Sequence, residues 1–70
     1  MKNLRLSLKA HRRLAKKNKE LQVKDKANYD KYFIKGSYHS KVANLQEKQN
    51  RVLSRKEKEK VYSDVVSTFY

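Results

Sequence analysis

The sequence contains no cysteine, no proline and no tryptophan, and its one glycine is Gly36. Without cysteine, the chain cannot form disulfides, use a thiol as a nucleophile or bind zinc through thiolates. Proline and glycine are the residues that most often interrupt helices, so a chain this poor in them favours helical structure. Good helix formers (Lys, Leu, Arg, Ala, Glu and Gln) fill more than half of the positions.

Long apolar runs are also missing. Lys2, Arg5 and Lys9 interrupt the first residues, so no apolar core of a signal peptide forms there. No segment approaches the roughly 20 apolar residues that a helix needs to cross a bilayer. We therefore expect a cytoplasmic protein without a membrane partner.

Acidic residues are scarce: 7 Asp and Glu stand against 19 Lys and Arg, which gives a net charge of +12. A charge of this size attracts phosphate-rich partners or acidic protein surfaces. The charge is concentrated in residues 1–26, which hold ten Lys or Arg and two acids. Residues 56–60 alternate in sign, as is typical of a solvated helix face.

Apolar residues are few as well. Leu, Ile, Val and Phe together account for 16 of the 70 residues, just above the content at which chains stay disordered. We expect one small domain over residues 1–70, an all-α bundle of three to four helices. The composition leaves open whether the bundle folds alone, by forming a homodimer or on binding a partner.

The first helix is predicted from about Asn3, as its N-cap, to about Val23. Apolar residues recur there at helical spacing, as Leu4, Leu8 and Leu21 illustrate. The basic residues lie on the opposite side of this helix and form the predicted site: Arg5, Lys9, Arg12, Arg13, Lys16, Lys17 and Lys19.

The middle of the chain contains the strongest turn signal. Asp25 is placed to cap a second, short helix, and Gly36 has the form of a glycine that ends it. Residues 36–40 are therefore predicted to be a loop, with Ser40 as the N-cap of a further helix. Whether the first two helices are continuous through residues 22–26 is left open.

The last helix is predicted over about residues 55–69. Ser54 and Glu57 have the spacing of a capping box, in which serine and glutamate bond each other's backbone N–H groups. The predicted core joins this helix to two aromatic residues of the second helix, and its members are Tyr32, Phe33, Val61, Val65, Val66 and Phe69.

Catalytic and metal-binding patterns are lacking. The two histidines, His11 and His39, lie on different predicted elements, and neither has a carboxylate at a metal-ligand or acid–base spacing. There is no glycine-rich phosphate loop and no nucleophile elbow. We expect no enzyme activity, no catalytic residue, no metal and no cofactor.

Nucleic-acid binding has the best physical case. A basic helix face from Arg5 to Lys19 would span roughly 20 Å and follow several phosphates of DNA or RNA. Tyr29, Tyr38 and His39, near the predicted loop, are the candidates for stacking on unpaired bases. We therefore predict a small nucleic-acid-binding accessory or regulatory protein.

The alternative is a small protein-binding regulator or inhibitor. Such a protein would dock the same basic helix on an acidic surface of a larger protein that processes nucleic acids. The charge pattern serves both functions equally.

Overall fold

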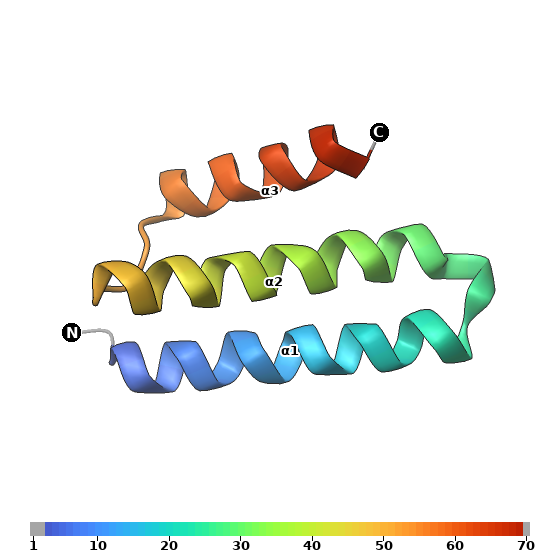
Figure 1. Cartoon of the computed structure of the whole chain (residues 1–70), viewed down its shortest axis with the longest axis horizontal. Coiled ribbons are helices and arrows are strands. Elements are labelled where there is room, and N and C mark those ends of the chain that lie inside the picture. Colours follow the sequence, from blue (N-terminus) through green and yellow to red (C-terminus); the bar gives the residue numbers. More distant parts are fainter. Residues whose placement is uncertain (1–2, 70) are drawn as a thin grey trace.

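A computed structural model describes residues 3–69; Met1, Lys2 and Tyr70 lie outside the described residues. Three α-helices follow one another: α1 (Leu4–Lys24), α2 (Tyr29–Gln49) and α3 (Arg55–Phe69). A 3-10 turn, Lys26–Asn28, joins α1 to α2, so the two helices are separate (Figure 1). The predicted all-α bundle is confirmed, with three helices in the described part of the chain.

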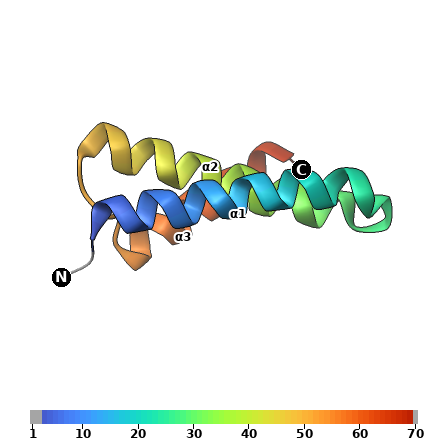
Figure 2. The same cartoon turned by 90° about the horizontal axis from the view of Figure 1, so that it is seen from below.

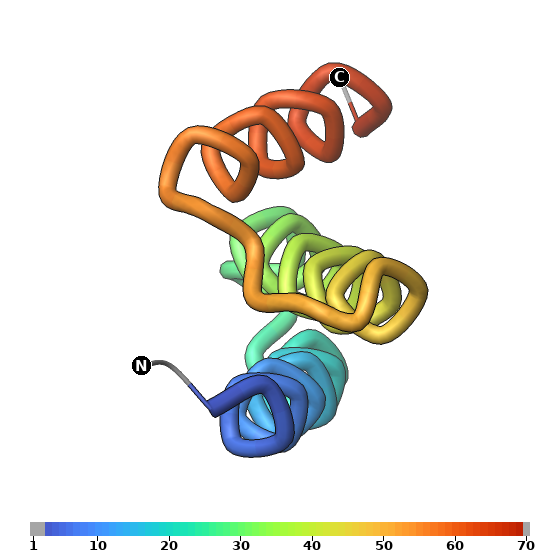
Figure 3. Tube along the Cα trace, turned by 90° about the vertical axis from the view of Figure 1, so that its left-hand side faces the viewer, coloured from blue at the N-terminus to red at the C-terminus, as the bar shows by residue number. Residues whose placement is uncertain are grey.

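The helices are stacked side by side with α2 in the middle. Figure 3, which looks along the helices, shows α1 and α3 on different sides of α2. The Cα atoms of α1 and α3 never approach within 8 Å of each other. Seen from below, α1 is nearest to the viewer, with α2 and α3 behind it (Figure 2). Both outer helices therefore depend on α2 for their position.

Local capping sets the start of α1 as the sequence predicts. The Asn3 side chain accepts hydrogen bonds from the backbone N–H groups of Arg5 (2.9 Å) and Leu6 (3.3 Å). These bonds satisfy two of the N–H groups that have no partner within the first turn. Asp25, in contrast, makes no capping bond to the second helix. Its carboxylate accepts a bond from the Asn28 side chain at 2.9 Å, so the prediction of an Asp25 cap is wrong.

The predicted loop at residues 36–40 is also wrong, because α2 runs through it without interruption to Gln49. Gly36 is buried against α1, where an added Cβ would lie 3.4 Å from the Cβ of Asn18. Only a small residue fits between the two helices here, and the packing of α2 on α1 outweighs the low helix propensity of glycine. Ser40 accordingly lies inside α2 and caps nothing.

The end of α2 is set by Asn50, which adopts the left-handed conformation (φ 54°, ψ 40°). Asparagine tolerates this conformation better than most residues, so it ends helices as glycine does. Residues 50–54 then lead into α3. Val52 and Leu53 belong to this connection.

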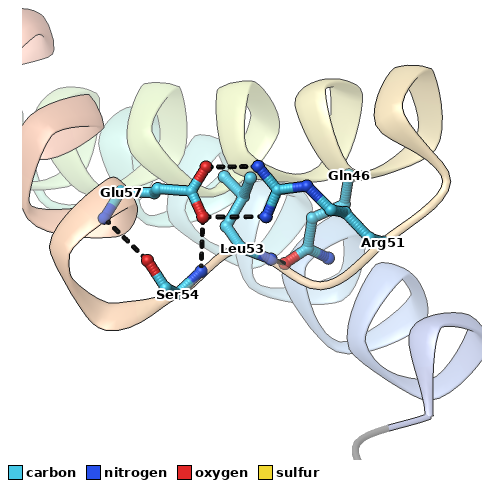
Figure 4. A network of polar contacts seen from close by, with 5 residues as sticks. All are labelled: Gln46, Arg51, Leu53, Ser54 and Glu57. Carbon is cyan, nitrogen blue, oxygen red and sulfur yellow. Dashed lines mark hydrogen bonds and ion pairs between the residues drawn. The ribbon is translucent and has the colours of Figure 1, made fainter.

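Polar contacts at the start of α3 confirm the predicted capping box (Figure 4). The Ser54 backbone N–H donates to Glu57 Oε1 (3.0 Å), and the Glu57 N–H donates to Ser54 Oγ (3.3 Å). Arg51 forms a bidentate ion pair with the same carboxylate. The hydrogen bond from Arg51 and those from Ser54 lower the pKa of Glu57 to about 2.

The core lies between α2, α3 and the connection that joins them. Its buried members are Ile34, Val42, Leu53, Val61 and Val65. The predicted contribution of α3 is observed, since Val66 and Phe69 also pack against this cluster. The predicted aromatic centre is observed only in part. Phe33 packs on Phe69, with ring centroids 5.1 Å apart, whereas the Tyr32 hydroxyl bonds the Asp25 carboxylate at 3.4 Å outside the cluster.

A fully buried glutamine of α2 is bonded to α1 and to the connection between α2 and α3. The Gln46 side chain, on α2, donates from Nε2 to the Ser7 hydroxyl of α1 at 3.0 Å. Its Oε1 accepts the backbone N–H of Leu53 at 3.2 Å, just before α3 begins (Figure 4). A buried amide is stable only when its donors and acceptors are paired, and here both ends are.

The close approach at Gly36 predicts opposite effects for two substitutions. Gly36→Ala should raise the free energy of unfolding by up to about 1 kcal/mol, because alanine favours the helix and the added Cβ meets only ordinary contacts. Gly36→Leu should lower it by about 2 kcal/mol, since its bulk would push α1 from α2. Urea denaturation followed by circular dichroism measures both. Equal effects of the two variants would contradict a close contact here.

The buried glutamine predicts a second effect. Gln46→Leu should lower the free energy of unfolding by about 2 kcal/mol, because the Leu53 N–H and the Ser7 hydroxyl lose their partner. Gln49→Leu is the matched control, since Gln49 is exposed and the expected change stays within about 0.5 kcal/mol. Chemical denaturation of the two variants side by side gives the comparison. A Gln46→Leu protein as stable as the parent would show that the bonds contribute nothing net.

Candidate nucleic-acid interface

The seven predicted basic residues all lie on α1 and are all exposed. Five of them follow one another at steps of four, three, four and three residues, which places them in one line on one face of the helix. They run from residue 5 to residue 19, a rise of about 21 Å along the helix. We name this line the cation stripe; it consists of Arg5, Lys9, Arg12, Lys16 and Lys19.

The other two residues of the predicted site lie apart from the stripe. Arg13 and Lys17 are four residues apart, on the neighbouring flank of α1. Lys17 lines a groove on the side of α1 that turns toward α3. The structure therefore divides the predicted set into a line of five and a pair that faces elsewhere.

Beside the stripe, α1 and α2 enclose a shallow hollow of about 270 Å³, which we name the polar groove. Three stripe cations line it on the α1 side, and Ser40 and Asn44 line it on the α2 side. Ala15 and Ala43, both buried, also line it, one from each helix. Hydroxyl and amide groups thus stand next to the cations, as they do in sites that hold phosphate oxygens.

Only one stripe residue has an acidic partner within residues 3–69. Arg12 forms an ion pair with Glu47 of α2, and both side chains are more than half exposed. The remaining four stripe cations form no ion pair with any described residue. Their charge is therefore not neutralised within this part of the chain, and it faces solvent.

Two exposed cations of α2, Lys41 and Lys48, were not part of the predicted site, which was confined to the first helix. Lys48 lies one turn from Asn44, which borders the polar groove, and so adds positive charge beside it. Lys41 instead lines a separate hollow with Val65 and Phe69 of α3.

The proposed stacking residues are not in a loop. Tyr38 and His39 are half-buried within α2, with ring centroids 4.9 Å apart and an edge-on geometry. Tyr29 opens α2 and stacks on Phe33, with centroids 6.1 Å apart. Of the three side chains, only Tyr29 is exposed, with 44% of its surface accessible to solvent.

The two histidines, which the sequence placed on separate elements, meet between α1 and α2. Their Nδ1 atoms are 2.9 Å apart, so one ring donates a hydrogen bond to the other when both are neutral. Burial lowers the pKa of His11 and of His39, and the positive charge of nearby Lys58 lowers both further. Mutual repulsion and Lys35 add to the lowering of the His39 pKa.

This histidine pair predicts that acid weakens the fold. A lowered pKa means that the unfolded chain binds protons more readily, so the stability contributed by the pair is complete above about pH 6.5. It should fall as the pH drops below that value and through the lowered pKa values of the folded state. Denaturation midpoints measured between about pH 7.5 and pH 5 test the effect.

The matched variant for this experiment is His11→Asn with His39→Asn, which keeps polar groups at both positions without a titrating ring. Glu57, with its pKa near 2, does not titrate in this range. The midpoint of the variant should therefore change much less with pH. An equal change in parent and variant would assign the effect to other groups.

No group of three or more His, Cys, Asp or Glu side chains comes together within residues 3–69. None of the three described helices has the length and apolar character needed to cross a membrane.

Comparison with protein-family models, with curated proteins and with solved structures gives no match to this chain.

Proposed function

We propose that the protein is a small nucleic-acid-binding accessory or regulatory factor, which contacts the phosphate backbone through the cation stripe of α1. The observation that carries this proposal is the line of five exposed cations, four of them without an ion-pair partner among the described residues. Bound phosphates would supply the missing countercharge, and released counterions would supply much of the affinity.

The geometry of the stripe suits a phosphate backbone. Its length of about 21 Å runs beside roughly a dozen charges of duplex DNA, which carries one charge per about 1.7 Å of its axis. Ser40 and Asn44 in the polar groove, with Lys48 beyond it, widen the contact from one helix to two. Contacts of this kind position a protein on nucleic acid.

The same contacts favour limited sequence discrimination. The arginine guanidinium reads guanine edges better than lysine does, but Arg12 is already paired with Glu47, which leaves Arg5 as the one arginine of the stripe without an ion pair to a described residue. Lysines make up three of the five stripe positions and act mainly as point charges. Binding should therefore depend strongly on salt and little on base sequence.

The alternative function is that of a small regulator or inhibitor that docks the stripe on an acidic protein surface. The same unpaired cations would serve this role. A homodimer and a cytoplasmic location remain predictions from the sequence, as does the lack of enzyme activity.

Removing stripe charge tests the proposal. Lys9→Gln, Lys16→Gln and Lys19→Gln together keep good helix formers in α1 while they remove three positive charges. On a duplex of about 20 base pairs, the slope of log K against log salt should become shallower by about 3, and affinity at low salt should fall at least about tenfold. Fluorescence anisotropy between about 50 and 200 mM salt measures both quantities.

A charge-matched control distinguishes the stripe from net charge. Lys31→Gln, Lys56→Gln and Lys60→Gln remove the same charge from exposed positions on α2 and α3. This variant should retain most of the affinity and the slope. Equal losses in both variants would contradict a localised interface. Tighter binding of the parent to polyglutamate than to either DNA or RNA would favour the acidic-protein alternative.

A further inference from the structure

A second, larger groove lies on the opposite flank of α1 from the polar groove. It has a volume of about 700 Å³ and is bordered by all three helices. Its walls are mainly apolar and aromatic, and we name it the aromatic groove after these residues: Leu14, Leu21, Tyr32, Tyr38, His39 and Tyr62.

The aromatic groove is open because nothing in the described chain fills the space between α1 and α3. The helix backbones on its two sides stay more than 8 Å apart (Figure 3). Toward the end of α2, Leu53 covers Val42 and Gln46, which are completely buried. Farther along the bundle there is no such cover, and Leu14 and Tyr62 remain 40% and 46% exposed.

Positive charge surrounds this opening. Lys17 from α1, Lys35 from α2 and Lys58 from α3 all line it. Its one acidic residue, Glu59, is 3.4 Å from Arg55 and so is already offset by a cation. A second copy of this chain carries +12 and would bring like charge to the opening. An occupant must therefore combine apolar and acidic groups.

From this combination we propose that the aromatic groove binds an amphipathic helix of a partner protein, with an apolar face and acidic flanks. Each of the three helices contributes lining residues that share one face of that helix. They fall within residues 14–21 of α1, 32–39 of α2 and 55–62 of α3. Each stretch covers about two turns, or roughly 10 Å. A fourth helix laid between α1 and α3 would cover the exposed apolar side chains and bring its acids to the lysines.

The aromatic rings suit this occupant better than unpaired bases. Tyr38 meets His39 and Tyr62 edge-on, with centroids 4.9 and 5.6 Å apart. Base stacking requires a free ring face, and these rings are already packed against one another. The leucines of α1 add an aliphatic wall, which accepts a leucine or isoleucine face of a helix well.

Two synthetic peptides test this inference directly. The first is an amphipathic helix of about 16 residues with leucine at helical spacing and glutamate on both flanks, and the second carries lysine in place of each glutamate. The acidic peptide should bind at least about tenfold more tightly than the basic one, as judged by fluorescence anisotropy. Amide shifts in NMR spectra should concentrate on the residues of the aromatic groove.

Charge-matched variants locate the site. Lys17→Glu with Lys58→Glu should lower the affinity for the acidic peptide by at least about tenfold. Lys9→Glu with Lys16→Glu makes the same change of net charge, but on the cation stripe. This variant should lower the affinity for the acidic peptide by less than about threefold. Leu14→Asn tests the apolar wall at a half-exposed position and should also reduce binding. Circular dichroism confirms that each variant is folded.

The outcomes separate the two proposals. Loss of peptide binding in the Lys17 and Lys58 variant, with peptide binding retained in the Lys9 and Lys16 variant, supports the groove. Equal effects of both charge variants would overturn it, as would equal binding of the acidic and basic peptides. Displacement of the peptide by single-stranded RNA, together with tighter binding of that RNA, would instead assign the groove to unpaired bases. None of these results depends on whether the cation stripe binds DNA.

Discussion

The side chain of Gln46 bonds α2 to α1 and to the connection that leads into α3. It has no exposed surface, and its amide is bonded to Ser7 of α1 and to the backbone of Leu53 ahead of α3. Apolar contacts are not directional and would tolerate several positions of such short helices. Paired amide hydrogen bonds have a fixed geometry, so they select one register among these positions. With few apolar residues, the chain gains specificity from a polar contact in its interior.

Local signals in the sequence predicted the outer parts of the fold well. Asn3 begins α1, and Ser54 with Glu57 begins α3, because each cap involves residues within three positions of one another. The apolar stripe of α3 was predicted for a similar reason. The helical spacing of apolar residues and the capping residues are local features of the sequence. They can therefore be recognised without knowing which other segment packs against the helix.

The errors lie where a distant contact decides the local structure. Gly36 reads as a helix end, yet it lies against Asn18, a residue 18 positions earlier in the chain. The meeting of His11 and His39 likewise depends on how α1 lies on α2. For the candidate site, the exposed face of α1 was predictable from its period. The Arg12 to Glu47 pair and the grooves on the two flanks of α1 required the positions of the other helices.

The small residues between α1 and α2 have a consequence for binding at the surface. Ala15, Gly36 and Ala43 bring two backbones close together, and the polar groove lies directly above this contact. The distance between the cations of α1 and the hydroxyl and amide groups of α2 therefore depends on residues in the contact between the two helices. A change of interior volume at these positions would alter the width of the basic surface without changing its charge.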